Sequence, residues 1–296
     1  MKYSIKGNIF LLMAAVVWGC GLVAQKAGMS HLGAFGFTAV RCTLGGVALL
    51  PLLFYMDKRK NEEQKKLEAG RKRIFMGSVC CGIALAILMM FQQLGLPYTT
   101  VGKAGFITAL YILITPLMGI LLGKKVSRNL WLGVVIGLAG MYMLCLFEGF
   151  SGVTFGDIMM LGAAVMASLH MHIVDYFVRT VDPVKLSAYQ FIVIGLVSFI
   201  PALIFENMTV EAVVDCAVPV LYAGIVSCGF GYTFQVIGQK YTSPSIASLV
   251  LSMETVFSLL AGWVFFREVL TLPEYIGGGL MIAAIIVSQI PDRKKI

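Results

Sequence analysis

The motif Gln92-Gln-Leu-Gly95 with Tyr98-Thr-Thr100 decides the fold, because the sequence repeats it 143 residues later. The second copy reads Gln235-Val-Ile-Gly238 and then Tyr241-Thr-Ser243. Weaker matches at offsets of 143 or 149 relate Ala104 to Ala247, Gly119 to Gly262, Gly7-Asn8 to Gly156-Asp157, and Arg41 to Gln190. We therefore expect two related units, residues 1–150 and 151–296.

Ten apolar segments are distributed over these units, five in each. A helix that crosses the hydrocarbon core of a bilayer needs about 20 residues, and the segments are close to that length. Their short connections leave no room for a soluble domain. One connection, residues 57–73, has 12 charged residues among 17 and is expected to be a solvated loop. The segments are 9–27, 35–56, 74–94, 100–122, 130–146, 158–178, 186–205, 217–239, 245–266 and 275–290.

The composition excludes a soluble enzyme, a disordered chain and a nucleic-acid-binding domain. Hydrophobic residues make up 59% and charged residues 13% of the chain, whereas soluble domains have about 45–50% and about 25%. The seven cysteines form no CxxC pair, and no histidine lies at zinc-ligand spacing from them. We therefore expect buried thiols that act as small apolar side chains, with neither a metal nor a cofactor.

The distribution of lysine and arginine residues predicts the orientation of the chain in the membrane. With ten crossings and a cytoplasmic N-terminus, 19 of the 23 basic residues face the cytoplasm. Cytoplasmic loops of membrane proteins are enriched in basic residues, so both termini are expected on that side. This bias also explains the net charge of +8 without a nucleic-acid partner. The other four basic residues are Lys26, Arg41, Lys103 and Arg267.

Five helices in each unit mean that the second unit enters the membrane from the opposite side. Inverted repeats of this kind are typical of secondary transporters, whose halves alternate access around a central site. An intramembrane lipid-modifying enzyme or a passive channel is the alternative. The sequence has no phosphate-binding loop, HExxH or GxSxG motif, and its polar residues lie at scattered depths rather than in one stripe. These features favour a carrier.

Several motifs are shared with a known family: Trp18-Gly19, Lys26, Arg41, Tyr98-Thr-Thr100, Gly238 to Glu254, Phe266-Arg-Glu268 and Gly277-Gly-Gly279. Over essentially its whole length the chain resembles the drug/metabolite transporter superfamily, in particular the EamA-type permeases. One departure is Gly123-Lys124-Lys125, where family members often have Gly-Glu, so that only Glu268 keeps the acidic residue. The resemblance implies a plasma-membrane carrier of small metabolites, often an exporter.

Glu254 is the main candidate for function among the ionisable residues inside the membrane. It follows Pro244 by ten residues in a segment that ends near Phe266, which places it near mid-depth. A carboxylate there is costly unless it is paired or hydrated, and such residues commonly mark transport pathways. Because burial favours the neutral carboxyl group, we expect Glu254 to exchange a proton. A helix–helix hydrogen bond is the structural alternative.

Two cations closer to the outer face are further candidates. Arg41 either snorkels to the outer interface or points inward, where it can bind a substrate carboxylate or Glu254. Lys103 follows Thr99-Thr100, a helix N-cap sequence, and a helix N-terminus together with a lysine can hold an anion. Snorkelling is the structural alternative for Lys103.

Neutral polar residues complete the predicted site. Tyr111 is the repeat counterpart of Glu254 and is expected to line the opposite wall of a central cavity. Gln92 and Gln190 can hydrogen-bond a substrate, although structural hydrogen bonds explain them equally well. His170 and His172 point about 200° apart on one helix, so they cannot share a metal. One of them is expected to face the cavity and the other to pack in the core.

We therefore predict an all-α integral membrane protein with ten transmembrane helices in two inverted five-helix repeats. It is expected to move small organic metabolites such as amino acids across the plasma (inner) membrane by alternating access. Its expected partners are a small-molecule solute and the lipid bilayer. A proton gradient, coupled through Glu254, or the gradient of the solute itself would supply the energy.

Overall fold

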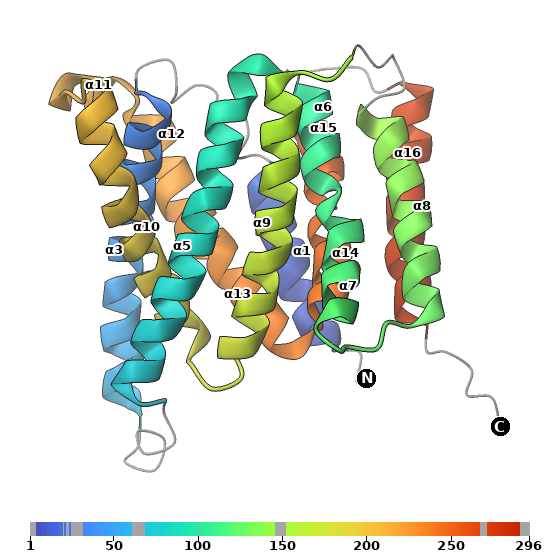
Figure 1. The fold of residues 1–296 in the computed structure, drawn as a ribbon, viewed down its shortest axis with the longest axis horizontal. Helices are drawn as coiled ribbons and strands as arrows, with labels where there is room; N and C mark the ends of the chain where they lie inside the picture. Colours follow the sequence, from blue (N-terminus) through green and yellow to red (C-terminus); the bar gives the residue numbers. More distant parts are fainter. Residues whose placement is uncertain are drawn as a thin grey trace.

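The computed structural model describes residues 4–19, 21, 24, 32–60, 69–99, 101–145, 152–266 and 271–290. The helices of this part of the chain lie side by side in one bundle (Figure 1). The first unit contains α1 (Ile5–Gly19), α3 (Ala34–Arg59), α5 (Arg71–Gly95), η1 (Leu96–Tyr98), α6 (Val101–Ala109), α7 (Tyr111–Leu121) and α8 (Arg128–Cys145). The second contains α9 (Phe155–Phe177), α10 (Pro183–Phe205), α11 (Val210–Asp215), α12 (Ala217–Leu221), η2 (Tyr222–Gly231), α13 (Tyr232–Tyr241), α14 (Pro244–Leu251), α15 (Glu254–Phe266) and α16 (Leu272–Gln289).

Within these residues, nine helical segments are long and apolar enough to cross a membrane, and α1 is a shorter apolar helix. The predicted all-helical membrane fold with about ten helices is thereby confirmed. Three crossings are each built from more than one helix: α6 with α7, α12 with η2 and α13, and α14 with α15. Part of the charged connection is helical, since α3 continues to Arg59 and α5 begins at Arg71. Residues 61–68 of that connection lie outside the described residues.

The two units run through the bundle in opposite directions. α1 begins at the end of the bundle where α9, the first crossing of the second unit, finishes (Figure 1). The start of α1 and the end of α16 lie at this same end (Figure 1). This arrangement agrees with an inverted repeat.

Glycine contacts between α3 and α10 follow the two-fold relation of the repeats. A Cβ atom on Gly46 would lie 2.9 Å from the carbonyl oxygen of Ala188 and 2.8 Å from the side chain of Ile192. A Cβ atom on Gly195 would meet the side chain of Thr43. Gly46 and Gly195 are 149 residues apart, as are Thr43 and Ile192. The same contact is therefore made twice, and a glycine in each unit allows the helices to approach.

The fifth helix of each unit, α8 or α16, packs against its counterpart in the same reciprocal way. A Cβ atom on Gly133 would lie 2.8 Å from the carbonyl oxygen of Ala284. A Cβ atom on Gly277 would lie 2.8 Å from the carbonyl oxygen of Gly140. The offset is 144 residues from Gly133 to Gly277 and from Gly140 to Ala284. Small residues thus hold both symmetric helix pairs together.

Most described lysines and arginines gather at one end of the bundle, which we call the basic end. It contains the start of α1 and the ends of α3, α7, α9 and α13 (Figure 1). Among the described residues, the opposite end has Lys103 as its one basic residue and several acidic ones. The acidic residues there are Asp157, Glu206, Glu211, Asp215 and Glu274. The positive-inside rule predicts that the basic end faces the cytoplasm.

Candidate functional site

Three crossing helices are interrupted inside the bundle, and a polar residue follows each interruption. α7 begins at Tyr111 after the turn at Leu110, and α15 begins at Glu254 after the turn at residues 252–253. α13 begins at Tyr232, directly after the π-helix η2. Tyr111 and Glu254 occupy the same position in the two units, 143 residues apart. Discontinuous helices at matching positions of two repeats are typical of transporter binding sites.

Local chemistry explains why the helices change course here. Pro116 of α7 has no backbone N–H to donate to the residue four positions before it, which weakens the first turn of α7. The hydroxyl of Ser252 donates to the carbonyl oxygen of Leu249 at 2.7 Å, just before α15. The hydroxyl of Thr233 donates to the carbonyl oxygen of Gly229 at 2.6 Å, beside the end of η2. Such side-chain bonds compete with the regular helical pattern.

The residues that follow the interruptions meet one another. Tyr111 interacts electrostatically with both Glu254 and Tyr232, and Tyr232 also interacts with Arg41. We call these four residues, Arg41, Tyr111, Tyr232 and Glu254, the mid-membrane cluster. Tyr111 and Arg41 are buried, with 5% and 2% of their surface exposed. A carboxyl group, two phenols and a guanidinium group thus lie in one region inside the bundle.

Aromatic rings form one wall of this cluster. The ring of Trp18 lies 4.5 Å from that of Tyr232, and the ring of Phe191 lies 5.2 Å from it, centroid to centroid. The indole N–H of Trp18 and the Nε of Arg41 are buried and have no partner among the described residues. Unpartnered buried donors are rare in folded proteins. Both donors are therefore candidates to bind an acceptor group of a solute.

Arg41 points into the bundle and does not snorkel to the interface. Its guanidinium group lies over the ring of Phe37, 5.3 Å from the centroid. The ion pairs of the described residues do not include one between Arg41 and Glu254. Of the options that the sequence left open, the inward orientation is the one observed, with the guanidinium group near Tyr232 rather than bound directly to the glutamate.

Lys103 has partners within the protein. Its ammonium group lies 2.6 Å from a carboxylate oxygen of Asp157 and donates to the carbonyl oxygen of Gly152 at 2.8 Å. The other carboxylate oxygen of Asp157 accepts from the hydroxyl of Thr99 at 2.5 Å. These contacts tie the start of α6 to the start of α9 at the end opposite the basic end. They favour a structural role for Lys103 over an anion site.

The side chains of His170 and His172 contact different parts of the bundle, as expected, and both are buried. His170 contacts the side-chain oxygen of Gln190 at 3.1 Å, which joins α9 to α10. His172 contacts the carbonyl oxygen of Thr115 at 3.0 Å. The amide nitrogen of Gln190 has no partner among the described residues. No group of three or more histidine, cysteine or acidic residues in the described chain is arranged to hold a metal ion.

In the first motif, the buried glutamine is Gln93, which follows the predicted residue Gln92. Gln92 is half-buried, whereas Gln93 is 1% exposed and both polar atoms of its side chain lack partners among the described residues. Tyr232, which lies in the mid-membrane cluster, was not among the predicted site residues. The available signal for Tyr232 was a polar aromatic residue one turn before Gln235, inside an apolar segment.

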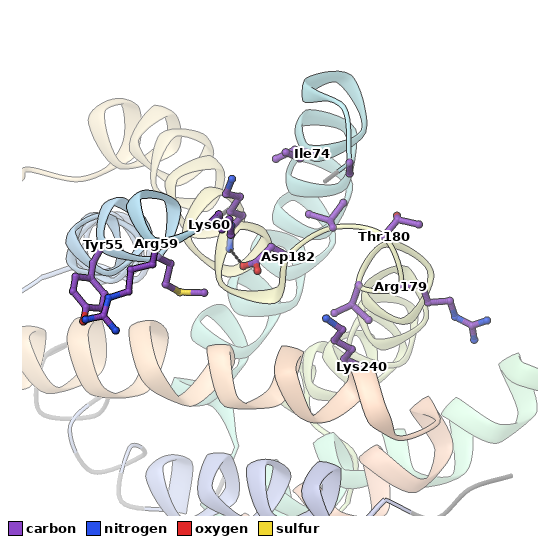
Figure 2. Close-up of a pocket in the computed structure, with 13 residues that line it drawn as sticks. Tyr55, Arg59, Lys60, Ile74, Arg179, Thr180, Asp182 and Lys240 are labelled. Atoms are coloured by element: carbon purple, nitrogen blue, oxygen red, sulfur yellow. Dashed lines mark hydrogen bonds between the residues drawn. The ribbon is translucent and has the colours of Figure 1, made fainter. Parts of the chain in front are cut away.

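Two cavities open at the basic end. The first, about 650 Å³, lies among α3, α5, α9, α10 and α13. Figure 2 shows Tyr55 and Arg59 on one side of it and Arg179 and Lys240 on the other. The second, about 630 Å³, is lined by residues from α1, α8, α9, α13, α14 and the connections beside them. No residue of the mid-membrane cluster lines either cavity.

Comparison with known proteins agrees with this architecture. Residues 5–146 and 154–289 both match the EamA-like transporter family. The chain belongs to this family. An uncharacterized transporter of Archaeoglobus fulgidus is 28% identical over 95% of the chain and 84% of its own length. For the uncharacterized transporter YoaV of Bacillus subtilis the identity is 22%, over 99% of the chain and 100% of the relative.

Two more comparisons agree with the assignment to the EamA family. The uncharacterized inner membrane transporter YedA of Escherichia coli is 23% identical over 95% of this EamA protein and 89% of its own length. A crystal structure with 18% sequence identity covers 96% of both chains with a TM-score of 0.78, which shows a shared fold. The protein is thus a multi-pass membrane transporter of the EamA family, and the alternative of an intramembrane enzyme is excluded.

Proposed function

We propose that this EamA protein is a secondary active transporter that exports small organic metabolites, such as amino acids, by alternating access around the mid-membrane cluster. The observation that carries the proposal is the matched interruption of two crossings at Tyr111 and Glu254. An interrupted helix leaves backbone N–H and C=O groups unpaired and exposes a polar side chain inside the membrane, where the backbone groups of a regular helix are all paired. The same position in both units therefore supplies one half of a site.

The two ends of the bundle support alternating access, because they differ. Cavities open at the basic end, whereas the contacts of the described residues at the opposite end join helices to one another. There, Lys103 pairs with Asp157, and the carboxylate of Glu206 accepts from the backbone N–H groups of Phe35 and Gly36 at 2.9 and 2.7 Å. If the basic end is cytoplasmic, this conformation receives solute from the cytoplasm, as an exporter requires.

Glu254 is the proposed coupling residue. It is the one carboxyl group of the mid-membrane cluster, and it has no ion-pair partner among the described residues. A proton on Glu254 removes a charge that is costly at this depth. Competition between a proton and the solute for the cluster would couple the two movements. The plasma (inner) membrane location is proposed from the basic end and from the name of the relative YedA.

Counterflow in proteoliposomes tests the proposal. Vesicles loaded with an unlabelled amino acid should take up the same labelled amino acid faster than empty vesicles, with saturable kinetics, for at least one member of a panel. Tyr111→Phe and Tyr232→Phe should weaken this exchange, because each removes a hydroxyl group from the cluster. Tyr275→Phe, at a tyrosine that is 62% exposed, is the matched control. Flux that neither saturates nor responds to internal solute would instead indicate a channel.

A further inference from the structure

The second cavity has an excess of positive charge. Four cationic side chains line it, from Lys124, Lys125, Arg179 and Lys240, and Asp175 is the one acidic residue in its lining. Asp175 binds Lys124 at 2.7 Å and Arg179 at 3.2 Å. Lys125 and Lys240 have no carboxylate partner among the described residues. Two cations therefore face this cavity without a compensating charge.

The first cavity differs, although it is also basic. Asp57, at its edge, binds Lys60 at 2.7 Å and Lys185 at 3.1 Å. The carboxylate of Asp182, in the middle of Figure 2, accepts from the backbone N–H groups of Val184 and Lys185 and so caps α10. Carboxylates of the chain itself thus bind Lys60 and Lys185 and cap α10 there, whereas Lys240 lines both cavities. The enrichment of basic residues at this end is thus not enough to make a vacant anion site.

The repeat shows which group is absent from the second cavity. At the opposite end of the bundle, the carboxylate of Asp157 accepts from the hydroxyl of Thr99 and from Lys103. The counterpart of Thr99 is Thr242, 143 residues later, and the counterpart of Asp157 is Asn8, 149 residues earlier. Both Asn8 and Thr242 line the second cavity. This cavity therefore occupies the symmetry-related place of the carboxylate site that Asp157 fills.

The hydroxyl group that would bind the absent carboxylate is without a partner. The Oγ1 atom of Thr242 is buried and makes no hydrogen bond with the described residues. Asn8 does not replace the aspartate, because its amide nitrogen donates to Gln289 at 2.6 Å. The Oγ atom of Ser243, the next residue, is also buried and unpartnered. Two hydroxyl groups are left free where the other unit binds a carboxylate.

Backbone donors lie beside these hydroxyl groups. α14 begins at Pro244, and its N-cap residue Ser243 makes no side-chain cap bond. Ser245 and Ile246, in the first turn, line the same cavity. Pro244 has no N–H group, and that of Ala247 donates to the carbonyl oxygen of Ser243. The N–H groups of Ser245 and Ile246 have no partner within the helix, and the helix dipole favours an anion there. Residues that carry hydroxyl groups, the first turn of α14 and two lysines without a carboxylate partner among the described residues thus line one cavity.

We infer that the second cavity binds a small oxyanion, with its carboxylate in the position symmetry-related to the carboxylate of Asp157. Thr242 donates to the anion, the first turn of α14 supports it, and Lys125 and Lys240 supply the opposite charge. If the protein is the exporter proposed above, the site receives anionic or zwitterionic solutes, so their carboxylate would be the recognised group. That last step rests on the proposed function, whereas the binding site itself does not.

Ligand-observed fluorine NMR tests the site on purified full-length protein in phosphatidylcholine nanodiscs. The probe is trifluoroacetate, with the neutral trifluoroacetamide as its control. Wild-type protein should bind trifluoroacetate and not trifluoroacetamide. Thr242→Val should weaken binding roughly tenfold or more, because it removes one hydrogen bond to a charged group, and Thr242→Ser should restore it. Asn8→Asp should abolish binding, because it installs the carboxylate of the other unit.

Further measurements in the same experiment distinguish the possible sources of the anion. Thr209→Val, at an N-cap distant from the cavity, is the matched control and should bind like wild type. Phosphatidylglycerol that displaces the probe from wild-type protein would show that a lipid phosphate uses the same site, and would overturn its assignment to a solute. Equal binding of trifluoroacetate by wild type, Thr242→Val and Asn8→Asp would overturn the site itself. Intact counterflow alongside that result would leave the proposed transport standing.

Discussion

The ion pair between Lys103 and Asp157 should hold the end opposite the basic end closed, and its loss should be costly. The two side chains are 5% and 4% exposed, so little solvent screens their charges. Lys103→Met leaves the carboxylate of Asp157 with Thr99 and the backbone N–H of Thr154 as partners. Removing one member of a buried pair costs about 3–5 kcal/mol. Lys103→Met with Asp157→Asn removes both charges and should recover about 1–3 kcal/mol of that loss.

Two measurements check this prediction. The free energy of unfolding, followed in mixed detergent micelles, should fall for Lys103→Met and rise again in the double variant. Labelling of Cys145 by a membrane-impermeant maleimide should increase in Lys103→Met, because Cys145 is half-buried beside α6 at the end that the pair closes. Strictly additive losses in the double variant, together with unchanged labelling of Cys145, would refute the closing role of the pair.

Two further predictions concern packing and orientation. Gly277→Ala should lower the free energy of unfolding by about 1–3 kcal/mol, because its Cβ would lie 2.8 Å from the carbonyl oxygen of Gly140. On the same helix Gly279→Ala meets no atom within 4 Å and should be neutral or stabilising; equal losses would contradict the close contact between α8 and α16. Cysteine at Lys65 should be labelled from the cytoplasmic side and cysteine at Glu211 from outside. Labelling of both from one side would contradict the inverted topology.

The fold could be predicted from the sequence because its main determinants are local. Segment length and hydropathy locate each crossing, and the repeated motifs relate one unit to the other. The helix ends were harder to predict from the sequence, because polar residues continue the helices into the charged connection. Arg59 does so and stacks on Tyr55, 4.5 Å from the ring centroid. The interruption before Tyr111 involves Pro116, and those before Tyr232 and Glu254 involve side-chain bonds to backbone carbonyl groups, which hydropathy does not report.

The site could be predicted only in part. Glu254 and Arg41 were predicted because each is an ionisable residue in an apolar segment, and Tyr111 because it is the repeat counterpart of Glu254. The structure places all three in one region of the bundle with Tyr232. The partner of Lys103 was not predictable from position, because Asp157 comes from the other unit and meets it only through the fold. Gln92 and Gln93 differ by about 100° around their helix, and the repeated motif alone does not show which of the two is the more buried.

Accumulation of solute driven by a pH gradient tests the coupling role of Glu254. Proteoliposomes with wild-type protein should concentrate a solute found by counterflow when a pH gradient is imposed, and should stop doing so when it collapses. Glu254→Gln keeps the size and hydrogen-bonding capacity of the side chain but cannot release a proton, so it should lose this accumulation while retaining exchange. Glu211→Gln, on the short helix α11, should behave like wild type. Full pH-driven accumulation by Glu254→Gln would contradict the coupling role of Glu254.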